Sequence, residues 1–203
     1  MKIMYTIIGL GNPGAEYEGT RHNTGRVIVK KIAEAAGAQL KEKKKPNHLA
    51  GVGEMAGERI RLVLPDTFMN NSGKAALPYV KSIRAAQNLV VIHDEIDLPL
   101  GVVRVSFGSS SGGHNGVKSI ERAIRTKNFI KIRIGVSKAA RGKAKKPPTD
   151  KGVIDYILGK FTAKERATIE GPIYERVLLA LQAILETGDP VRGMNAVNGL
   201  PIA

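Results

Sequence analysis

Cysteine is missing from this chain of 203 residues, and its absence excludes three kinds of protein. A disulfide-stapled scaffold, a thiolate nucleophile and a cysteine-ligated zinc site all need residues that the sequence does not contain. Long hydrophobic runs are missing too, since no apolar stretch approaches the roughly 20 residues of a membrane-spanning helix. The apolar run from Ile3 to Leu10 leads into Gly11-Asn12-Pro13-Gly14 instead of a small-residue cleavage site. We therefore expect no signal peptide, no membrane partner and a cytoplasmic protein.

Acidic residues are scarce in one part of the chain. Residues 102–149 contain twelve Lys or Arg and the single acid Glu121, a net charge of +11 in a chain whose net charge is +14. The segment 41–45, Lys-Glu-Lys-Lys-Lys, supplies the other three charges. Such concentration is typical of a polyanion-binding surface, and the lack of a basic amphipathic helix favours nucleic acid over a membrane. A basic face that is merely solvated stays open as an alternative.

The hydrophobic pattern predicts alternating strands and helices. With 42% apolar and 25% charged residues, the composition is that of a globular protein. Short apolar runs predict strands, and 3.6-residue periodicity with capping signals predicts helices. The expected strands are 3–8, 48–56, 59–64, 89–92, 102–107 and 130–136, and the expected helices are 24–36, 72–86, 115–125 and a long final helix opened by Thr162-x-x-Glu165.

This order of elements predicts the fold class. We expect a single α/β domain over residues 1–203, with a mixed, twisted β-sheet flanked by helices in three α/β/α layers. Residues 138–151 hold six basic residues and two consecutive prolines, so we expect a mobile surface loop there. Gly171-Pro172 is expected to kink or split the C-terminal helix.

Polar clusters follow several of the expected strands, where open α/β sheets place their sites. Gly9-Leu10-Gly11-Asn12-Pro13-Gly14 formally matches the dinucleotide motif G-x-G-x-x-G. The residues that follow lack a helical pattern, and Glu34 lies inside a predicted helix instead of at a strand end. We therefore disfavour a dinucleotide oxidoreductase. The segment is either a tight turn that presents the Asn12 amide or only a turn.

Two further clusters leave alternatives open when taken alone. His22 lies in a polar loop, where a single histidine is more often a surface residue than a catalyst. The segment 65–73 contains Asn70 and Ser72, either of which fits a helix N-cap, and it presents Phe68 and Met69 as a stacking or packing surface.

Two later clusters also carry candidate chemistry. His93-Asp94-Glu95-Ile96-Asp97 fits a magnesium site, a carboxylate that orients an imidazole, or a solvated acidic turn. The Gly/Ser segment 108–116 fits a loop that brings backbone N–H groups to a ligand. It lacks the Gly-Lys-[Ser/Thr] ending of a P-loop, so we disfavour nucleotide hydrolysis, and Ser110 matches a nucleophile elbow only superficially.

Taken together, these clusters resemble a known family. The chain is similar to the bacterial peptidyl-tRNA hydrolases in the order of four motifs and of Arg133-Ile134-Gly135-Val136 after them. The motifs are Gly9-Leu10-Gly11-Asn12-Pro13-Gly14 with Tyr17 and Thr20-Arg21-His22-Asn23, Thr67-Phe68-Met69-Asn70-x-Ser72-Gly73, His93-Asp94-Glu95-x-Asp97-x-Pro99-x-Gly101, and Gly112-Gly113-His114-Asn115-Gly116. They cover residues 3–136 densely, whereas the tail resembles the family only in pattern.

The resemblance implies hydrolysis of the ester that joins a peptide to the terminal ribose of tRNA. It implies His22 as general base and Asp94 as its orienting partner. An ester needs only a deprotonated water and a stabilised oxyanion, so we expect no metal and no other cofactor. The resemblance further implies a monomer that binds peptidyl-tRNA. The residues that it assigns to holding substrate and water are Asn12, Asn70 and Asn115, and those that it assigns to tRNA or to the pocket are Tyr17, Phe68, Met69, Arg104 and Arg133.

A non-catalytic RNA-binding relative of the same fold, similar to a plant organellar splicing factor, is the alternative function. Such a protein would bind RNA through its basic surface and would not use the candidate catalytic cleft. The intact set of His22, Asp94 and three asparagines favours the enzyme. An organellar import sequence would favour the relative, and we expect none because the chain starts directly with Met1-Lys2-Ile3.

Overall fold

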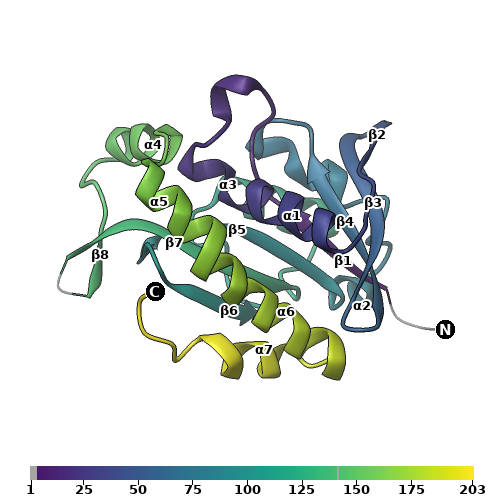
Figure 1. Ribbon diagram of the computed structural model, residues 1–203. Coiled ribbons are helices and arrows are strands. Elements are labelled where there is room, and N and C mark those ends of the chain that lie inside the picture. The colour runs from purple at the N-terminus through teal and green to yellow at the C-terminus, as the bar shows by residue number, and fades with distance from the viewer. Residues whose placement is uncertain (1–3, 141) are drawn as a thin grey trace.

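The computed structural model describes residues 4–140 and 142–203, which form an eight-stranded sheet with helices on both faces (Figure 1). Strand order is β2-β3-β4-β1-β5-β7-β6, and β8 pairs with β7. The strands are β1 (Tyr5–Gly9), β2 (Lys41–Lys44), β3 (Asn47–Met55), β4 (Glu58–Pro65), β5 (Leu89–Pro99), β6 (Val103–Phe107), β7 (Ile130–Ala140) and β8 (Lys143–Lys145). The helices are α1 (Thr24–Ala35), α2 (Ile83–Ala86), α3 (Asn115–Ile124), α4 (Asp150–Leu158), α5 (Ala163–Thr168), α6 (Tyr174–Thr187) and α7 (Pro190–Val197).

The sheet is mixed, as the sequence predicts. Strands β4, β1, β5 and β7 are mutually parallel in the centre, and β2, β3, β6 and β8 pair antiparallel around them. The carboxyl ends of the parallel strands therefore meet along one edge. Polar motifs follow β1 and β4 at this edge, and the second half of β5 carries His93 to Asp97 there.

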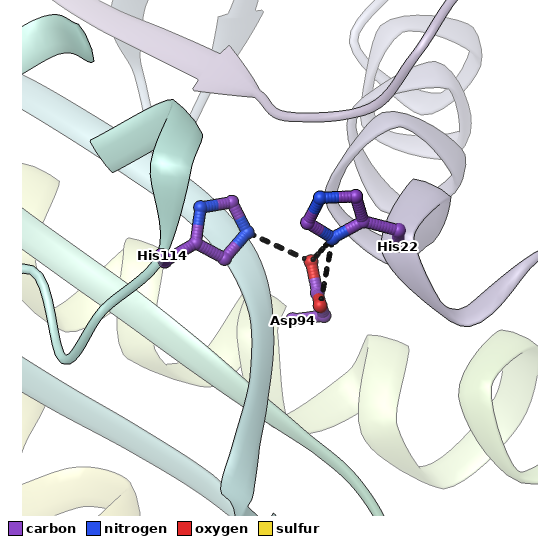
Figure 2. Close-up of side chains that lie close together, drawn as sticks. All are labelled: His22, Asp94 and His114. Carbon is purple, nitrogen blue, oxygen red and sulfur yellow. Dashed lines mark hydrogen bonds and ion pairs between the residues drawn. The ribbon is translucent and has the colours of Figure 1, made fainter. Parts of the chain in front are cut away.

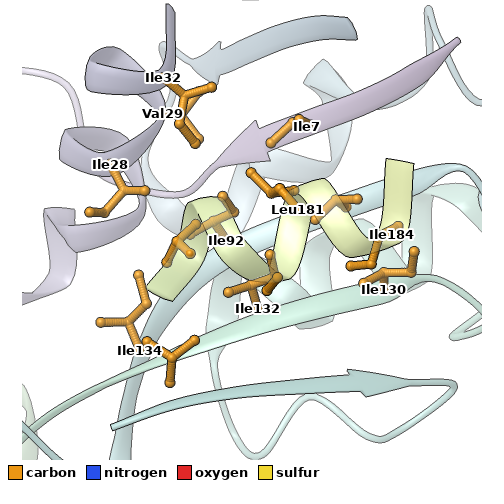
Figure 3. Close-up of a cluster of buried hydrophobic side chains, with 14 of the residues drawn as sticks. Ile7, Ile28, Val29, Ile32, Ile92, Ile130, Ile132, Ile134, Leu181 and Ile184 are labelled. Carbon is orange, nitrogen blue, oxygen red and sulfur yellow. The ribbon is translucent and has the colours of Figure 1, made fainter. Parts of the chain in front are cut away.

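Two apolar clusters hold the three layers together. On one face, α1 and α6 cover the sheet, and Ile7, Ile92 and Ile132 interdigitate with Val29 and Leu181 (Figure 3). On the other face, α3 and the 3-10 segment Met69–Ala75 cover a second cluster. Isoleucine, valine and leucine in these clusters are almost all fully buried, and each contributes roughly 1.5–3 kcal/mol from burial. The three-layer α/β/α prediction is confirmed.

The predicted helix over residues 72–86 is wrong. The chain instead forms the 3-10 segment Met69–Ala75, a run of turns and the short helix α2. Gly73 N donates to Ser119 Oγ (3.0 Å), a bond that joins this segment to α3. Pro78 has no N–H to donate and interrupts any continuous helix through this region.

Residues 138–151 also differ from the predicted loop. Residues 138–140 extend β7 and pair antiparallel with β8, Lys138 opposite Lys145, and α4 begins at Asp150. Gly142 has a φ of +74°, which glycine adopts readily. Residue 141 of this segment and residue 3 of the first predicted strand lie outside the described residues.

The C-terminal helix is split where the sequence predicts it. Thr162 and Glu165 form the expected capping box at the start of α5. Gly171 and Pro172 lie in a π-helical segment, Ile169–Ile173, which joins α5 to α6. Proline cannot supply the N–H of an ordinary helical turn, so the ladder widens there. Within the described part of the chain, no helix is both long and apolar enough to cross a membrane.

Candidate active site

A close contact between α1 and β5 places the candidate catalytic turn. A Cβ atom on Gly25 would lie 2.1 Å from the carbonyl oxygen of Ile92, so only glycine permits this approach. The 3-10 turn Arg21–Asn23 directly precedes α1. Asp94 follows Ile92 by two residues along β5. The glycine thus brings His22 to Asp94 although 72 residues separate them.

His22 and Asp94 form a buried pair (Figure 2). Nδ1 of His22 lies 3.0 Å from Oδ2 and 3.1 Å from Oδ1 of Asp94. An ionised carboxylate only accepts hydrogen bonds, so Nδ1 of His22 carries the proton and donates. The lone pair of neutral His22 is consequently on Nε2, which points away from the carboxylate. This is the tautomer that can accept a proton from water.

The two partners shift each other's pKa in the direction that base catalysis needs. Burial alone would lower the pKa of His22, but the charge of Asp94 and the hydrogen bond to it raise the pKa above 6.5. Burial alone would raise the pKa of Asp94, yet the charges and hydrogen bonds of His22 and His114 hold it well below its usual range. Asp94 therefore stays ionised and stabilises the imidazolium that forms when His22 takes a proton.

His114 is a second partner of Asp94 that sequence reasoning missed. Its Nδ1 accepts from the backbone N–H groups of Gly116 (3.1 Å) and Val117 (3.4 Å), which caps α3. The proton of the neutral ring must then be on Nε2, which donates to Asp94 Oδ1 at 2.9 Å. A signal was present, because His114 lies inside a quoted motif beside Asn115. No pattern in the sequence, however, pairs it with a carboxylate 20 residues away.

The same three residues are close enough to hold a metal ion. One ligand atom from each of His22, Asp94 and His114 lies within 4.8 Å of the others. Metal ligation needs a free imidazole lone pair on the nitrogen that faces the ion. Nε2 of His114 carries a proton instead, because Nδ1 is occupied by the α3 cap. The donor set therefore fits a hydrogen-bonded carboxylate better than a metal site.

His93 lies behind this cluster. Its ring centroid is 4.7 Å from that of His114, and its Nδ1 donates to the Asp94 backbone carbonyl at 2.7 Å. Complete burial, reinforced by the nearby His114, lowers the pKa of His93 to about 3, so this ring stays neutral at physiological pH. Neutral His93 adds no charge that would oppose protonation of His22.

The three predicted amides lie in different environments, and of the three only Asn115 lines the cavity that contains His22 and Asp94. Asn12 is buried, and its Oδ1 accepts from Met69 N at 2.9 Å. Its backbone exchanges two hydrogen bonds with the side chain of Asn23, at 2.8 and 2.9 Å, which fixes the turn next to His22. Asn70 and Asn115 are exposed at the first turns of Met69–Ala75 and of α3. The helix does not begin on the Gly9–Gly14 turn but at Thr24, so the dinucleotide motif is incomplete.

The two predicted aromatic contacts, Tyr17 and Phe68, lie next to each other. Phe68 is 58% exposed, and its ring is edge-on to that of Tyr17 with centroids 6.3 Å apart. Met69 differs from its neighbour because it is buried in the second apolar cluster, where Gly116 permits its sulfur to approach α3.

The predicted basic residues Arg104 and Arg133 lie opposite each other on β6 and β7. Both are partly exposed. Arg133 Nε donates to Oε2 of Glu95 at 3.0 Å, and the Glu95 side chain is only 5% exposed. The ion pair fixes the guanidinium beside the acidic end of β5. Ser106, the next outward position on β6, bonds to Ser109 across 2.9 Å.

A cavity of about 290 Å³ opens over the His–Asp pair. Its lining includes His22, Asp94 and Asn115 on one side and apolar side chains of α4, namely Val153, Ile154 and Ile157, on the other. Lys146 and Asp97 also line the cavity and form a 2.7 Å ion pair with each other. Helix α4 is absent from the sequence prediction, which placed a loop up to residue 151, and so its contribution to the site was missed as well.

A buried carboxylate, an imidazole with a free Nε2 and the exposed amide of Asn115 in one cavity define a class of protein. This class is the hydrolytic enzymes, in which an imidazole paired with a carboxylate can take a proton from water. The model of the family described as peptidyl-tRNA hydrolase matches residues 6–202.

Relatives and a solved structure agree with this match. The peptidyl-tRNA hydrolases of Alkaliphilus oremlandii and Syntrophotalea carbinolica are 39% and 36% identical to the chain, over 97% and 96% of it and 100% and 97% of their own lengths. The crystal structure of peptidyl-tRNA hydrolase from Acinetobacter baumannii has a TM-score of 0.85 at 34% identity, covering 100% of this chain and 98% of that one. The chain belongs to the peptidyl-tRNA hydrolase family, and it is an enzyme.

Proposed function

We propose that the chain hydrolyses the ester bond between a peptide and the 3′-terminal ribose of tRNA, and so recycles tRNA from prematurely released peptidyl-tRNA. The observation that carries this proposal is the hydrogen bond from His22 Nδ1 to the ionised Asp94, which leaves Nε2 as the base. The family match supports the substrate. Neither the match nor the relatives support the non-catalytic alternative.

The reaction begins when His22 Nε2 takes a proton from water. The resulting hydroxide attacks the ester carbonyl, and negative charge develops on the carbonyl oxygen. Exposed amides of Asn70 and Asn115 are the proposed donors to that oxyanion, because an amide stays neutral and offers two N–H groups. When the tetrahedral intermediate collapses, the C–O bond to the ribose breaks and the imidazolium returns its proton to the ribose oxygen.

Asn12 is the proposed sensor of the blocked amino group. Its Oδ1 already accepts from Met69 N, which fixes the orientation of the amide and leaves Nδ2 as a donor. An N–H donor suits the carbonyl oxygen of an acylated amino group. A free ammonium group is positively charged and offers only donors, so the Nδ2 hydrogens would repel it. Asn12 therefore favours peptidyl-tRNA over charged aminoacyl-tRNA.

The tRNA is proposed to lie over two aromatic side chains and over the basic residues of β6 and β7. Phe68, which is exposed, and Tyr17, which is half-buried, form an aromatic pair on which a 3′-terminal base can stack. Arg104 and Arg133 present a pair of guanidinium groups, and only Nε of Arg133 is used by Glu95. The remaining N–H groups are suited to phosphate. We also propose that the enzyme works as a monomer in the cytoplasm without a metal or other cofactor.

Release of tRNA from N-acetyl-aminoacyl-tRNA tests the proposed function, with the unblocked aminoacyl-tRNA as the matched control. We expect cleavage of the blocked ester and little cleavage of the unblocked one, since only the former lacks the ammonium. Free tRNA is measured by its mobility in acidic gels. Tight binding of both substrates with cleavage of neither would contradict the proposal and support the RNA-binding alternative.

Raising the salt concentration is expected to weaken tRNA binding steeply. Each phosphate neutralised by Lys or Arg releases counterions, so the logarithm of the association constant falls linearly with the logarithm of salt concentration. Filter binding of uncharged tRNA at several salt concentrations gives the slope. Single substitutions Arg104→Gln and Arg133→Gln should each reduce the slope by about one. A flat response in the wild type would show that the net charge of +14 is only surface charge.

A further inference from the structure

Arg21 directly precedes His22, yet it faces the opposite way, into the segment that joins α4 to α5. Its guanidinium NH1 lies 3.1 Å from the carbonyl oxygens of Gly159 and Lys160 and 3.5 Å from that of Tyr156. The side chain is only 9% exposed. One guanidinium nitrogen therefore faces three carbonyls at the carboxyl end of α4, where a helix dipole attracts positive charge.

The other terminal nitrogen of Arg21 bonds to α5. NH2 donates to both carboxylate oxygens of Glu165 at 3.1 Å. The flat guanidinium also contacts two aromatic rings, with Cζ 4.4 Å from the centroid of Tyr156 and 5.2 Å from that of Phe161. Tyr156 in turn donates its hydroxyl to the carbonyl of Val136 on β7 at 2.9 Å. A guanidinium stacks flat on aromatic rings and donates hydrogen bonds from two nitrogens at once, whereas the ammonium group of lysine does neither.

Backbone bonds join the same two segments. Arg21 N donates to Gly159 O at 3.1 Å, and Phe161 N donates to Gly19 O at 2.9 Å. Thr20 and Lys160 form an isolated β-bridge between these bonds. The turn that carries His22 and the connection after α4 are thus held as one unit, and Arg21 lies at its centre.

This unit spans both sides of the catalytic cavity. His22 lines one side, and Val153, Ile154 and Ile157 of α4 line the other. The outward bonds of Arg21 lead to α4 and α5, whereas His22 bonds inward to Asp94. A shift of α4 would consequently pull on the turn through Arg21 and change the distance between His22 Nδ1 and the carboxylate.

We propose that Arg21 is a positioning residue, which joins α4 to the catalytic turn so that His22 stays against Asp94 while α4 lines the cavity. This inference rests on the proposed function for its kinetic consequence. Its structural consequence, the alignment of the His22 imidazole, is measurable without any substrate.

The test is the variant Arg21→Met, with Arg166→Met as its control. Arg166 is an exposed arginine of α5 that makes no ion pair within the described part of the chain. We expect kcat on N-acetyl-aminoacyl-tRNA to fall roughly 10- to 100-fold, since small misplacement of a reacting group costs up to about 100-fold. KM and the Kd for uncharged tRNA should stay within about twofold, because the Arg21 side chain is buried and is not among the residues proposed to contact tRNA. Arg166→Met should keep the wild-type kcat.

NMR titration of the His22 imidazole supplies the readout that a merely stabilising residue would not move. In the wild type its pKa is raised by Asp94. In Arg21→Met the looser contact with Asp94 should lower that pKa toward or below 6.5. A variant with a lower Tm but an unchanged kcat and an unchanged His22 titration would overturn the proposal.

Two more conservative variants test the same proposal if Arg21→Met folds poorly. Glu165→Gln removes the ion pair but retains a residue type that completes a capping box, so we expect an intermediate loss of kcat and an intermediate pKa change. Arg21→Lys keeps the positive charge but loses the second donor nitrogen, so its kcat should remain well below that of the wild type. Full activity in Arg21→Lys, or no change in Glu165→Gln, would contradict the proposal. If wild-type protein cleaves no blocked substrate, the proposed function fails, whereas the titration still decides the role of Arg21.

Discussion

Replacement of His22 by alanine is expected to lower kcat by about 10²–10⁴, the usual contribution of a general base. Without the imidazole, nothing described next to Asp94 can take a proton from water: His114 Nε2 carries a proton, and its Nδ1 is occupied by the α3 cap. The ester is still held by the amides and the tRNA surface, so residual hydrolysis above the uncatalysed rate remains. Single-turnover release of tRNA from N-acetyl-aminoacyl-tRNA at saturating enzyme measures the loss directly.

The control for His22→Ala is another buried histidine, His48. It bonds to Tyr79 Oη and the carbonyl of Pro46, on the far side of β4 from the catalytic turn. His48→Ala is expected to lower stability while kcat at low temperature stays near that of the wild type. Binding of uncharged tRNA should persist in both variants. Near-normal turnover by His22→Ala would contradict the assignment of His22 as the base.

The wild-type pH profile is expected to follow from the same residue. Only neutral His22 accepts a proton, so kcat/KM should rise with pH and level off above the pKa of His22. Because Asp94 and its hydrogen bond outweigh burial, that pKa is raised, and the inflection should lie above 6.5. His114 lies 5.0 Å away, centroid to centroid, and is the other titratable ring facing His22. A profile already level below pH 6 would contradict a raised pKa for the base.

Local sequence patterns predicted the central elements of the fold well. Strand β1 and residues 89–92 of β5 are short apolar runs, and α1 shows clear helical periodicity. These patterns are reliable because burial alone decides them. The motifs after β1 and β4 lie at strand ends as predicted, whereas His93 to Asp97 lie inside β5, which continues past the predicted end at residue 92 to Pro99. The His22–Asp94 pair was predicted from family resemblance, and the structure brings the two residues together.

The parts that the sequence did not predict depend on contacts between distant residues. Helix α4 has no buried residue, and its apolar side lines the cavity. The hydrophobic pattern of its sequence is therefore too weak to predict a helix. Strand β8 consists of Lys-Ala-Lys and exists only because β7 offers it a partner. The bonds of Arg21 reach residues 135–144 positions away, and the sequence does not reveal such distances.

The hydrogen bonds of Asp94 set the tautomers of both neighbouring rings. Oδ1 accepts from His114, whose Nε2 must carry its proton because Nδ1 caps α3. Oδ2 lies 3.0 Å from His22 Nδ1. If an amide replaces the carboxylate, its oxygen must remain on the His114 side, where a donor faces it. Its NH₂ group then faces His22 Nδ1. The lone pair of His22 would turn to Nδ1 to accept this bond, and the proton would move to Nε2.

Asp94→Asn is therefore expected to keep the fold and the distances while lowering kcat by up to about 10⁴, because Nε2 of His22 can no longer accept a proton. The loss of negative charge also removes what raises the pKa of His22, so the residual activity should reach its plateau at a lower pH than in the wild type. Rates on N-acetyl-aminoacyl-tRNA between pH 5 and 9 measure both effects. The matched control is Asp97→Asn, an exposed carboxylate paired with Lys146, which should change kcat little. A loss of activity in Asp94→Asn with an unshifted pH profile would show that Asp94 only maintains the shape of the site, whereas a shifted profile with the wild-type fold shows that its charge sets the tautomer of the base.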